Sequence, residues 1–498
     1  WFSIVRMKLL TAIVLLATTL TLSESVMVCY YGSWAVYRNG KGKFDVEDID
    51  PFLCTHIVFG FAGLGSDNKV RVLDPYNELC ENYGKCAYDR FTALKKQNPN
   101  LVTTLAVGGW NEGSASYSKM AADPAARATF ADSVLEMLNA HDFDGLDFDW
   151  EYPTQRGGNP EDKVNFVILM SELKKALHGD GKILTAAVSA GKATIDAAYD
   201  VPGFADTVDY IHVMAYDLHG AWDKYTHHHT ILYQYPEDEG DNIYLNVDYA
   251  IQYWLSMGAP AHKLVLGTAT YGRCWRLDDT SDTGMYAPAS SPGSPGPYTY
   301  SPGFLGYNEI CEHDLTSPWT IVNEPVMNEP YIYDLSFGNT WCSYDSPDSI
   351  ITKALYAKDN GLAGMMVWSI ETDDFLAECH SRPSILIRNM HEAFSGESLT
   401  TLPPPITTTR DPLDPTDPPT TVTFPTASPG EHCAYPGNNP DPYDCSFFYQ
   451  CVYDGTGYIE YIVYCSEGAL FNPITFICDY DYAVCALGDE YCPANCPL

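Results

Sequence analysis

The chain has 498 residues, more than one hydrophobic core usually holds, and this length predicts at least two domains. Hydrophobic residues make up 46% of the sequence and aromatic residues 13%, a composition that excludes a largely disordered chain. The formal net charge of −37 excludes nucleic acid and an anionic membrane as expected partners.

The N-terminal segment has the pattern of a secretory signal. Met7 and Lys8 precede the apolar run LLTAIVLLATTLTL, and the small residues Ser23 and Ser25 come just before Val26. We interpret residues 7–25 as a signal peptide, which predicts a secreted, extracellular protein, with an uncleaved anchor as the alternative. No other apolar stretch is as long as a membrane-spanning helix requires.

Residues 26–397 alternate between short β-rich runs and amphipathic helical stretches, which is typical of a parallel α/β sheet. Apolar spacing predicts helices over 124–141 and 163–178. The β-rich runs lie at 26–33, 56–64, 101–109, 143–151, 183–189, 210–218, 263–272 and 364–370. Eight such strands predict an α/β fold, a closed (β/α)8 TIM barrel.

The connection between the seventh and eighth runs is unusually long. It holds about ninety residues rich in Tyr, Pro and Gly, without helical periodicity, which is far more than a βα unit needs. We expect residues 274–345 to form an inserted α+β subdomain.

The fourth run, FDGLDFDWE at 143–151, combines apolar residues with four acids. Residues two apart in a strand face the same side, so Asp147, Asp149 and Glu151 share one face, opposite Leu146, Phe148 and Trp150. In a barrel this acidic face points inward and rises toward the C-terminal rim. Asp144 has the opposite parity, and we expect it to be structural.

Three carboxyl groups stacked in a low-dielectric interior cannot all ionise freely. We therefore expect the acidic neighbours of Glu151, at the rim, to raise its pKa and keep it protonated as a general acid. A calcium site or a solvated acidic strand is the alternative. Calcium loops need turn glycines at fixed offsets, and a solvated strand would not carry Phe148 and Trp150 on its other face.

These residues resemble a known family. DGLDFDWE matches the DxxDxDxE signature of glycoside hydrolase family 18, the chitinases, and the resemblance spans about residues 26 to 395. Further family motifs are AVGGW at 106–110, MAYD at 214–217, TYGR at 270–273 and MVWSIETDDF at 366–375. The resemblance implies that the insertion is the family's α+β subdomain, which forms one wall of a substrate cleft.

The resemblance also implies a mechanism in which the substrate's own 2-acetamido group replaces an enzyme nucleophile. Glu151 would protonate the glycosidic oxygen and then activate water, while Asp149 would hold the acetamido N–H and stabilise an oxazolinium ion. Asp147 would modulate the proton on Asp149, and Tyr216 would bind the acetamido oxygen. Trp368 would lie beneath the distorted sugar ring.

Further residues at the strand ends are candidates for substrate binding, although a lone aromatic residue there is more often part of the core. The candidates are Tyr30, Trp34, Phe61, Gly109, Trp110, Met214, Asp217, Trp222, Tyr271, Arg273 and Trp368.

Three adjacent histidines in THHHTIL, residues 226–232, depart from the family's usual loop after the sixth strand. Consecutive loop residues rarely converge on one ion, so we expect a solvated loop here and no metal or cofactor.

Sixteen cysteines in a secreted chain predict disulfides rather than zinc sites. The family resemblance pairs Cys29 with Cys54 and Cys311 with Cys379. Elimination then leaves two further pairs in this part of the chain, Cys80 with Cys86 and Cys274 with Cys342.

A Thr- and Pro-rich linker over 398–431 separates the barrel from residues 432–498. The latter segment is too short to fold stably without disulfide bonds. The spacing C-x11-C-x5-C-x13-C-x12-C-x6-C from Cys433 to Cys485 resembles the peritrophin-A type chitin-binding module of carbohydrate-binding family 14; an unrelated disulfide knot is the alternative. The resemblance implies the pairs Cys433–Cys451, Cys445–Cys485 and Cys465–Cys478. Candidates for stacking on sugar rings are Tyr443, Phe447, Phe448, Tyr449 and Phe471.

Together these features predict a secreted, monomeric endo-chitinase that binds chitin and chitooligosaccharides. A semi-rigid tether to a chitin-binding module favours an insoluble polymer as substrate, because it raises the local enzyme concentration. A chitinase-like lectin without activity and a structural chitin-binding protein are the two alternatives.

Overall fold

We analysed a computed structural model that describes residues 25–399, apart from 325, 326 and 328, and the segments 437–440, 444–453, 458–465, 469–472 and 477–480. Residues 7–24 of the predicted signal peptide, most of the linker and Tyr443 lie outside the described residues. No helix in the described part is long and apolar enough to cross a membrane.

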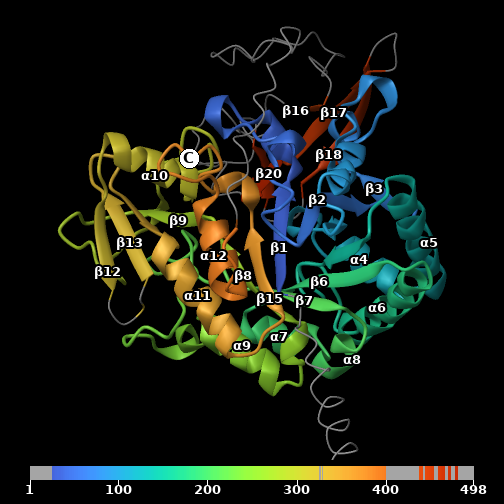
Figure 1. The fold of residues 1–498 in the computed structure, drawn as a ribbon, viewed down its shortest axis with the longest axis horizontal. Helices are drawn as coiled ribbons and strands as arrows, with labels where there is room; N and C mark the ends of the chain where they lie inside the picture. Colours follow the sequence, from blue (N-terminus) through green and yellow to red (C-terminus); the bar gives the residue numbers. More distant parts are fainter. Residues whose placement is uncertain are drawn as a thin grey trace, which may run out of the picture.

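Eight parallel strands form a closed barrel (Figure 1). In chain order they are β1 (Val26–Gly32), β2 (His56–Leu64), β4 (Val102–Gly108), β5 (Gly145–Asp149), β6 (Ile183–Ser189), β7 (Tyr210–Met214), β8 (Leu264–Ala269) and β15 (Gly364–Trp368). Pairing of β1 with both β2 and β15 closes the barrel. The predicted strands and the barrel are therefore confirmed, and a short strand β3 (Val70–Val72) pairs antiparallel with β2 outside it.

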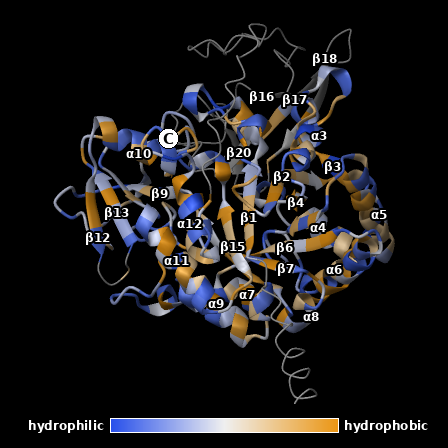
Figure 2. Cartoon of the chain, in the orientation of Figure 1, coloured by the Kyte–Doolittle hydropathy of each residue, from blue (hydrophilic) through white to orange (hydrophobic). Residues whose placement is uncertain are grey.

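Helices surround the barrel, and their ribbons alternate between hydrophobic and hydrophilic residues (Figure 2). They are α2 (Pro75–Glu78), α3 (Ala87–Thr92), α4 (Ala115–Ala122), α5 (Pro124–Ala140), α6 (Asp162–Gly179), α7 (Lys192–Ala198), α8 (Val201–Ala205), α9 (Val247–Ser256), α11 (Pro347–Asp359) and α12 (Ile385–Ser395). Pro124 at the start of α5 follows Asp123, whose side chain accepts the N–H of Ala125 and caps the helix. The two helices predicted from apolar spacing correspond to α5 and α6.

The outward face of β5 belongs to the core between strands and helices. Leu146 and Phe148 are fully buried, and the Phe148 ring lies 5.9 Å from Phe130 of α5 and 6.3 Å from Phe166 of α6. Trp150, of the same parity, is also buried and donates its indole N–H to Ser114. The acidic residues of β5 consequently face the barrel interior.

A second sheet lies to one side of the barrel, on the left in Figure 1. Its strands are β9 (Tyr271–Arg276), β10 (Ser291–Pro292), β11 (Phe304–Gly306), β12 (Thr320–Glu324), β13 (Glu329–Asp334) and β14 (Thr340–Ser343), accompanied by α10 (Tyr307–Thr316). The run predicted as one strand over 263–272 is divided between β8 and β9, so the second sheet begins at Tyr271. Thr270 separates the two strands, and its hydroxyl donates to the carbonyl of Ser369.

The described C-terminal segments form two small antiparallel sheets. Their strands are β16 (Gly437–Pro440), β17 (Phe447–Tyr453), β18 (Tyr458–Tyr464), β19 (Ala469–Asn472) and β20 (Ile477–Tyr480). Phe448 and Tyr449 are buried and Phe447 is half-buried, so packing accounts for the first two rings. Sugar stacking by this group of aromatic residues stays a prediction.

Four disulfides connect the cysteines before residue 400: Cys29–Cys54, Cys80–Cys86, Cys274–Cys342 and Cys311–Cys379. These are the pairs expected from the family resemblance and by elimination. Cys29–Cys54 joins the first barrel strand to the segment before β2, while Cys274–Cys342 links β9 to β14 inside the second sheet.

Candidate active site

The candidate active site begins with the acids of β5. Asp147 and Asp149 are buried, and Glu151, two residues beyond Asp149, is half-buried. Because these three residues alternate with the buried outer face, their side chains form an inward row. A solvated acidic strand is therefore the wrong interpretation.

Asp147, the deepest acid of the row, is surrounded by hydrogen-bond partners. Its Oδ2 accepts the Tyr30 hydroxyl at 2.6 Å, and its Oδ1 accepts the Thr185 hydroxyl at 2.6 Å. His212 Nδ1 lies 3.1 Å from Oδ1 and 3.0 Å from the Tyr30 hydroxyl. Residues of three other barrel strands, β1, β6 and β7, thus hold this carboxyl group in one orientation.

Asp149 and Glu151 have strongly perturbed acidities. Burial, followed by the charges of Glu151 and Asp147, raises the pKa of Asp149 well above its usual range. Burial also raises the pKa of Glu151 to about 7, and the charge of Asp217 adds to this shift while Arg156 opposes it. Loss of solvent is therefore the main cause at Glu151, rather than the acidic neighbours that the sequence suggested.

Tyr216 and Asp217 follow β7 at the rim. The half-buried Tyr216 hydroxyl lies 3.8 Å from the Met366 sulfur, and burial together with the charge of Asp149 raises its pKa, so it remains a hydrogen-bond donor. Burial alone would raise the pKa of Asp217, but the charge and hydrogen bonds of Arg273 hold it well below its usual range. Asp217 is an ionised neighbour of Glu151.

Asp217 is held by residues of the second sheet. Arg273 donates two hydrogen bonds to its carboxylate, Nε to Oδ1 and Nη2 to Oδ2, both at 2.7 Å, and the Tyr271 hydroxyl donates to Oδ1 at 2.7 Å. The Arg273 guanidinium also lies 5.4 Å from the ring centroid of the exposed Trp222. These residues form one wall beside the acids.

An aromatic cluster forms the floor. The Trp368 ring lies 5.6 Å from Tyr30, 5.6 Å from Phe61 and 5.9 Å from Trp34, and the last two rings stack at an interplanar angle of 10°. Phe61, Met214, Tyr216 and Trp368 all pack, partly exposed, on the apolar cluster inside the barrel. Apolar ring surfaces beside a few convergent polar groups are typical of a sugar-binding cleft.

The β4 end explains why AVGGW needs its glycines. A Cβ at Gly108, whose φ is +124°, would lie 1.9 Å from the Asp149 carbonyl, and the Gly109 N–H donates to that carbonyl at 2.8 Å. The next residue, Trp110, carries the Arg156 guanidinium 3.6 Å from its ring centroid. Arg156 also donates to the Trp110 and Glu151 carbonyls, at 2.6 Å and 3.2 Å.

The histidine segment is buried, so the expectation of a solvated loop is wrong. His227, His228 and His229 are each 0% exposed, and each buried ring has a polar partner outside the histidine segment. Their Nε2 atoms lie 2.9 Å from Asp238 Oδ1, 3.3 Å from the Tyr344 carbonyl and 3.2 Å from the Tyr271 carbonyl, respectively. Each ring is therefore committed to a different part of the fold.

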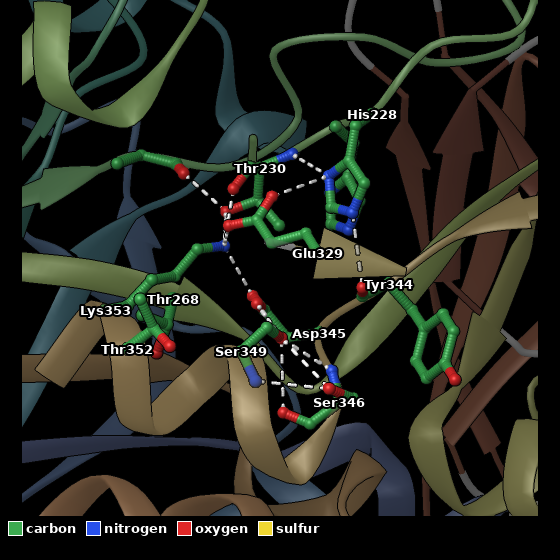
Figure 3. A network of polar contacts seen from close by, with 12 residues as sticks. His228, Thr230, Thr268, Glu329, Tyr344, Asp345, Ser346, Ser349, Thr352 and Lys353 are labelled. Atoms are coloured by element: carbon green, nitrogen blue, oxygen red, sulfur yellow. Dashed lines mark hydrogen bonds and ion pairs between the residues drawn. The ribbon is translucent and has the colours of Figure 1, made fainter. Parts of the chain in front are cut away.

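A buried charged cluster, the Lys353 cluster, lies behind this segment (Figure 3). Lys353 Nζ is 2.7 Å from Asp345 Oδ2 and 3.0 Å from Glu329 Oε1, and it donates to the hydroxyl and carbonyl of Thr230. His228 Nδ1 lies 3.5 Å from Glu329 Oε2. The cluster joins α11, the second sheet and the histidine segment.

Some of these residues were not singled out from the sequence. His212 shares its strand face with Met214 and Tyr216, so the same alternation that revealed the acid row could have placed it inside the barrel. Arg156 lies in a loop without periodicity, and no sequence signal indicated that it would reach Trp110 and Glu151.

The fold and this site define a glycoside hydrolase built on a (β/α)8 barrel. The model of the glycosyl hydrolases family 18 matches residues 26–373, and the chain belongs to this family.

Individual relatives and solved structures support this family assignment. Probable chitinase 2 of Drosophila melanogaster is 43% identical over 378 residues, covering 73% of this chain and 75% of that protein. The crystal structure of Ostrinia furnacalis Group IV chitinase in complex with allosamidin is 43% identical, with a TM-score of 0.72 over 76% of this chain and 100% of that chain. Human YKL-39, a pseudo-chitinase with retained chitooligosaccharide binding, is 35% identical with a TM-score of 0.68, over 74% of this chain and 100% of that chain.

Proposed function

We propose that the protein is a secreted endo-chitinase that hydrolyses polymers of β-1,4-linked N-acetylglucosamine. The observation that carries this proposal is Glu151, a carboxyl group with a pKa of about 7 at the top of an inward acid row and beside an aromatic floor. A group with this pKa is still partly protonated near neutral pH, as a general acid must be. The likeness to Probable chitinase 2 and to the allosamidin-bound chitinase supports chitin as the substrate class.

The first chemical step is cleavage of the glycosidic bond with help from the substrate. Glu151 donates its proton to the glycosidic oxygen while the carbonyl oxygen of the sugar's 2-acetamido group bonds to the anomeric carbon. The bond to the leaving sugar breaks, and an oxazolinium ion remains. Tyr216, a protonated donor, positions the acetamido oxygen, and the Asp149 carboxylate accepts the acetamido N–H and stabilises the positive charge.

The second step returns the enzyme to its starting state. The Glu151 carboxylate removes a proton from water, and the water oxygen bonds to the anomeric carbon as the oxazolinium ring opens. Two displacements at one carbon give net retention of configuration. Asp147, fixed by Tyr30 and Thr185, lies below Asp149 and modulates the proton on Asp149.

The remaining parts of the proposal concern location and substrate form. The N-terminal signal pattern and the cysteine content support secretion. The cysteine spacing from Cys433 to Cys485 supports a C-terminal chitin-binding module, joined through the linker, that keeps the barrel near insoluble chitin.

The test compares the wild-type protein with Glu151→Gln on a chitin oligosaccharide and on insoluble chitin, following product release and binding. We expect Gln to reduce product release by about 10² to 10⁴-fold and to leave binding intact, because Gln keeps the shape but cannot supply the proton. A wild-type protein that binds at every pH but releases no product would instead be a sugar-binding relative, as YKL-39 is.

A further inference from the structure

We propose that His229 is a positioning residue of the cleft, because its Nδ1 accepts the backbone N–H of Asp217 and holds Asp217 where Tyr271 and Arg273 can bind its carboxylate. The proposal deepens the proposed function and rests on it. It assigns a role to a histidine that contacts neither the acids of β5 nor the aromatic floor.

The partners of His229 determine its tautomer. Nε2 lies 3.2 Å from the Tyr271 carbonyl, which can only accept, so Nε2 carries the hydrogen. Burial lowers the pKa of His229, which keeps the ring neutral and leaves Nδ1 as an acceptor. The Asp217 N–H, at 3.4 Å, donates to that atom.

His229 differs from its two neighbours in what its Nδ1 contacts. Nδ1 of His227 accepts the N–H of His228 at 2.9 Å, and Nδ1 of His228 accepts the N–H of Thr230 at 3.3 Å. Both of these donors lie within the histidine segment, although His228 Nδ1 also lies 3.5 Å from Glu329 Oε2. Of the three backbone N–H donors, only that of Asp217 lies outside the segment, and Asp217 is the residue beside the general acid.

Asp217 needs such a support because of its backbone. Its φ is +54°, in the left-handed region that non-glycine residues adopt at a cost. The Leu218 N–H donates to the His229 carbonyl at 2.9 Å, so His229 holds two consecutive backbone groups. With Asp217 fixed in this way, its carboxylate meets the Arg273 fork at 2.7 Å on both oxygens.

His229 is itself anchored from behind. Its own N–H donates to the Ser343 hydroxyl of β14 at 3.1 Å, and the neighbouring Thr230 is held by Lys353 (Figure 3). The groups that act on the ring are the carboxylates of Asp217 and Asp345 and the guanidinium of Arg273. His229 therefore connects the second sheet to Asp217, which follows β7.

The consequence for catalysis follows from charge. The negative charge of Asp217 contributes to the raised pKa of Glu151. If Asp217 moves away, the pKa of Glu151 falls, and a smaller fraction of Glu151 is protonated at a given pH. The activity of a general acid declines as pH rises through its pKa, so the basic limb of the pH–rate profile moves to lower pH.

Two substitutions separate this role from simple packing. His229→Asn retains an acceptor at the position of Nδ1 and loses the donor to Tyr271, whereas His229→Gln retains a donor near Nε2 and loses the acceptor for Asp217. His227→Asn and His227→Gln are the matched controls, because the Nδ1 contact of His227 is local. Each full-length variant is assayed for kcat/KM on a chitin oligosaccharide across pH, with a thermal melt at each pH.

We expect His229→Asn to keep the wild-type profile and His229→Gln to lose roughly 10 to 100-fold in kcat/KM, with the basic limb at lower pH. Equal losses in Asn and Gln, or none in either, would overturn the proposal. If the Gln variant does not fold, a folded Asn variant with a displaced basic limb overturns it equally. A wild-type protein without hydrolysis contradicts the proposed function instead, so the two failures are distinguishable.

Discussion

Two groups of buried ionisable residues lie close to the barrel, and they differ in the charges that surround them. In the Lys353 cluster, an ammonium group lies within 3.0 Å of two carboxylates and donates to Thr230 as well (Figure 3). In the acid row of β5, by contrast, the carboxyl groups of Asp147, Asp149 and Glu151 neighbour one another.

We interpret the first group as one that stabilises the fold and the second as the one that carries the proposed chemistry. Nearby carboxylates raise the pKa of Lys353 although burial alone would lower it, so its charge is retained. Burial also raises the pKa of Glu329 to about 8, against the opposing charge of Lys353, so Lys353 and Asp345 form the ion pair of the cluster. At Asp149 burial and the charges of Glu151 and Asp147 all raise the pKa, and at Glu151 burial outweighs the opposing Tyr152 hydrogen bond and Arg156 charge. A general acid must hold its proton at neutral pH, and a raised pKa of this kind allows it to do so.

The largest expected effect comes from removing the cation of the Lys353 cluster. Lys353→Met leaves Glu329 and Asp345 buried without their cation, and we expect it to lower the free energy of unfolding by about 3 to 5 kcal/mol. Urea denaturation of the two proteins measures the change. Lys358→Met, on the exposed face of the same helix, is the control and should shift it by less than about 0.5 kcal/mol. Equal effects would mean that the cluster does not support the fold.

The acid row should respond in activity rather than in stability. In the proposed mechanism Asp149 stabilises the oxazolinium ion, and Asp149→Asn removes the carboxyl group that does so, so we expect kcat to fall by about 10² to 10³-fold with oligosaccharide binding retained. Asp144→Asn, directly before the same strand, is the control. Asp144 accepts the N–H and hydroxyl of Thr103, outside the row, so that variant should keep its kcat. A loss of kcat in both variants would show that the strand, and not the row, had been disturbed.

The pH dependence of the stability of Glu151→Gln tests whether the pKa of Glu151 is raised in the folded protein. Its pKa is about 7 in the folded protein and near 4.3 when unfolded, so the folded state binds more protons between these values. Stability from this group is therefore present below about pH 4.3 and is lost as pH rises through about 7. Glu151→Gln should be more stable than wild type by about 2 kcal/mol at pH 8, allowing for partial exposure, and equal to it at pH 4.

Thermal melts at pH 4 and pH 8 measure this difference. Glu136→Gln, on the exposed face of α5, is the matched control and should show no such pH dependence. If Glu151→Gln were no more stable than wild type at pH 8, Glu151 would be solvated in the folded protein, and its role as the proton store would be contradicted.

The contrast between the two groups also explains what could be predicted from the sequence. The acid row is local: alternation within FDGLDFDWE predicted which residues face inward, and continuous apolar runs predicted the eight strands. The Lys353 cluster is not local. Its members come from Thr230, Glu329, Asp345 and Lys353, up to 123 residues apart, and no sequence period connects them.

The error in the histidine segment has the same origin. THHHTIL reads as a polar loop because polar residues are normally exposed, but its buried rings are satisfied by partners outside it, Asp238, Tyr344 and Tyr271. The division of the predicted seventh strand at Thr270 likewise depends on a contact with Ser369, 99 residues away. Sequence periodicity predicts the layers of the fold, and it does not predict the polar partners that meet between them.

The smallest effect concerns Tyr30, which connects Asp147 to the floor. Tyr30→Phe removes the hydroxyl that donates to Asp147 at 2.6 Å but keeps the ring against Trp368, and we expect a loss of about 1 to 2 kcal/mol in the free energy of unfolding. The adjacent Tyr31 provides the control, because its buried hydroxyl has no hydrogen-bond partner among the described residues. Tyr31→Phe should therefore be neutral or slightly stabilising, since it removes an unsatisfied polar atom. Urea denaturation of both variants would contradict this account of the row if Tyr31→Phe proved the more damaging change.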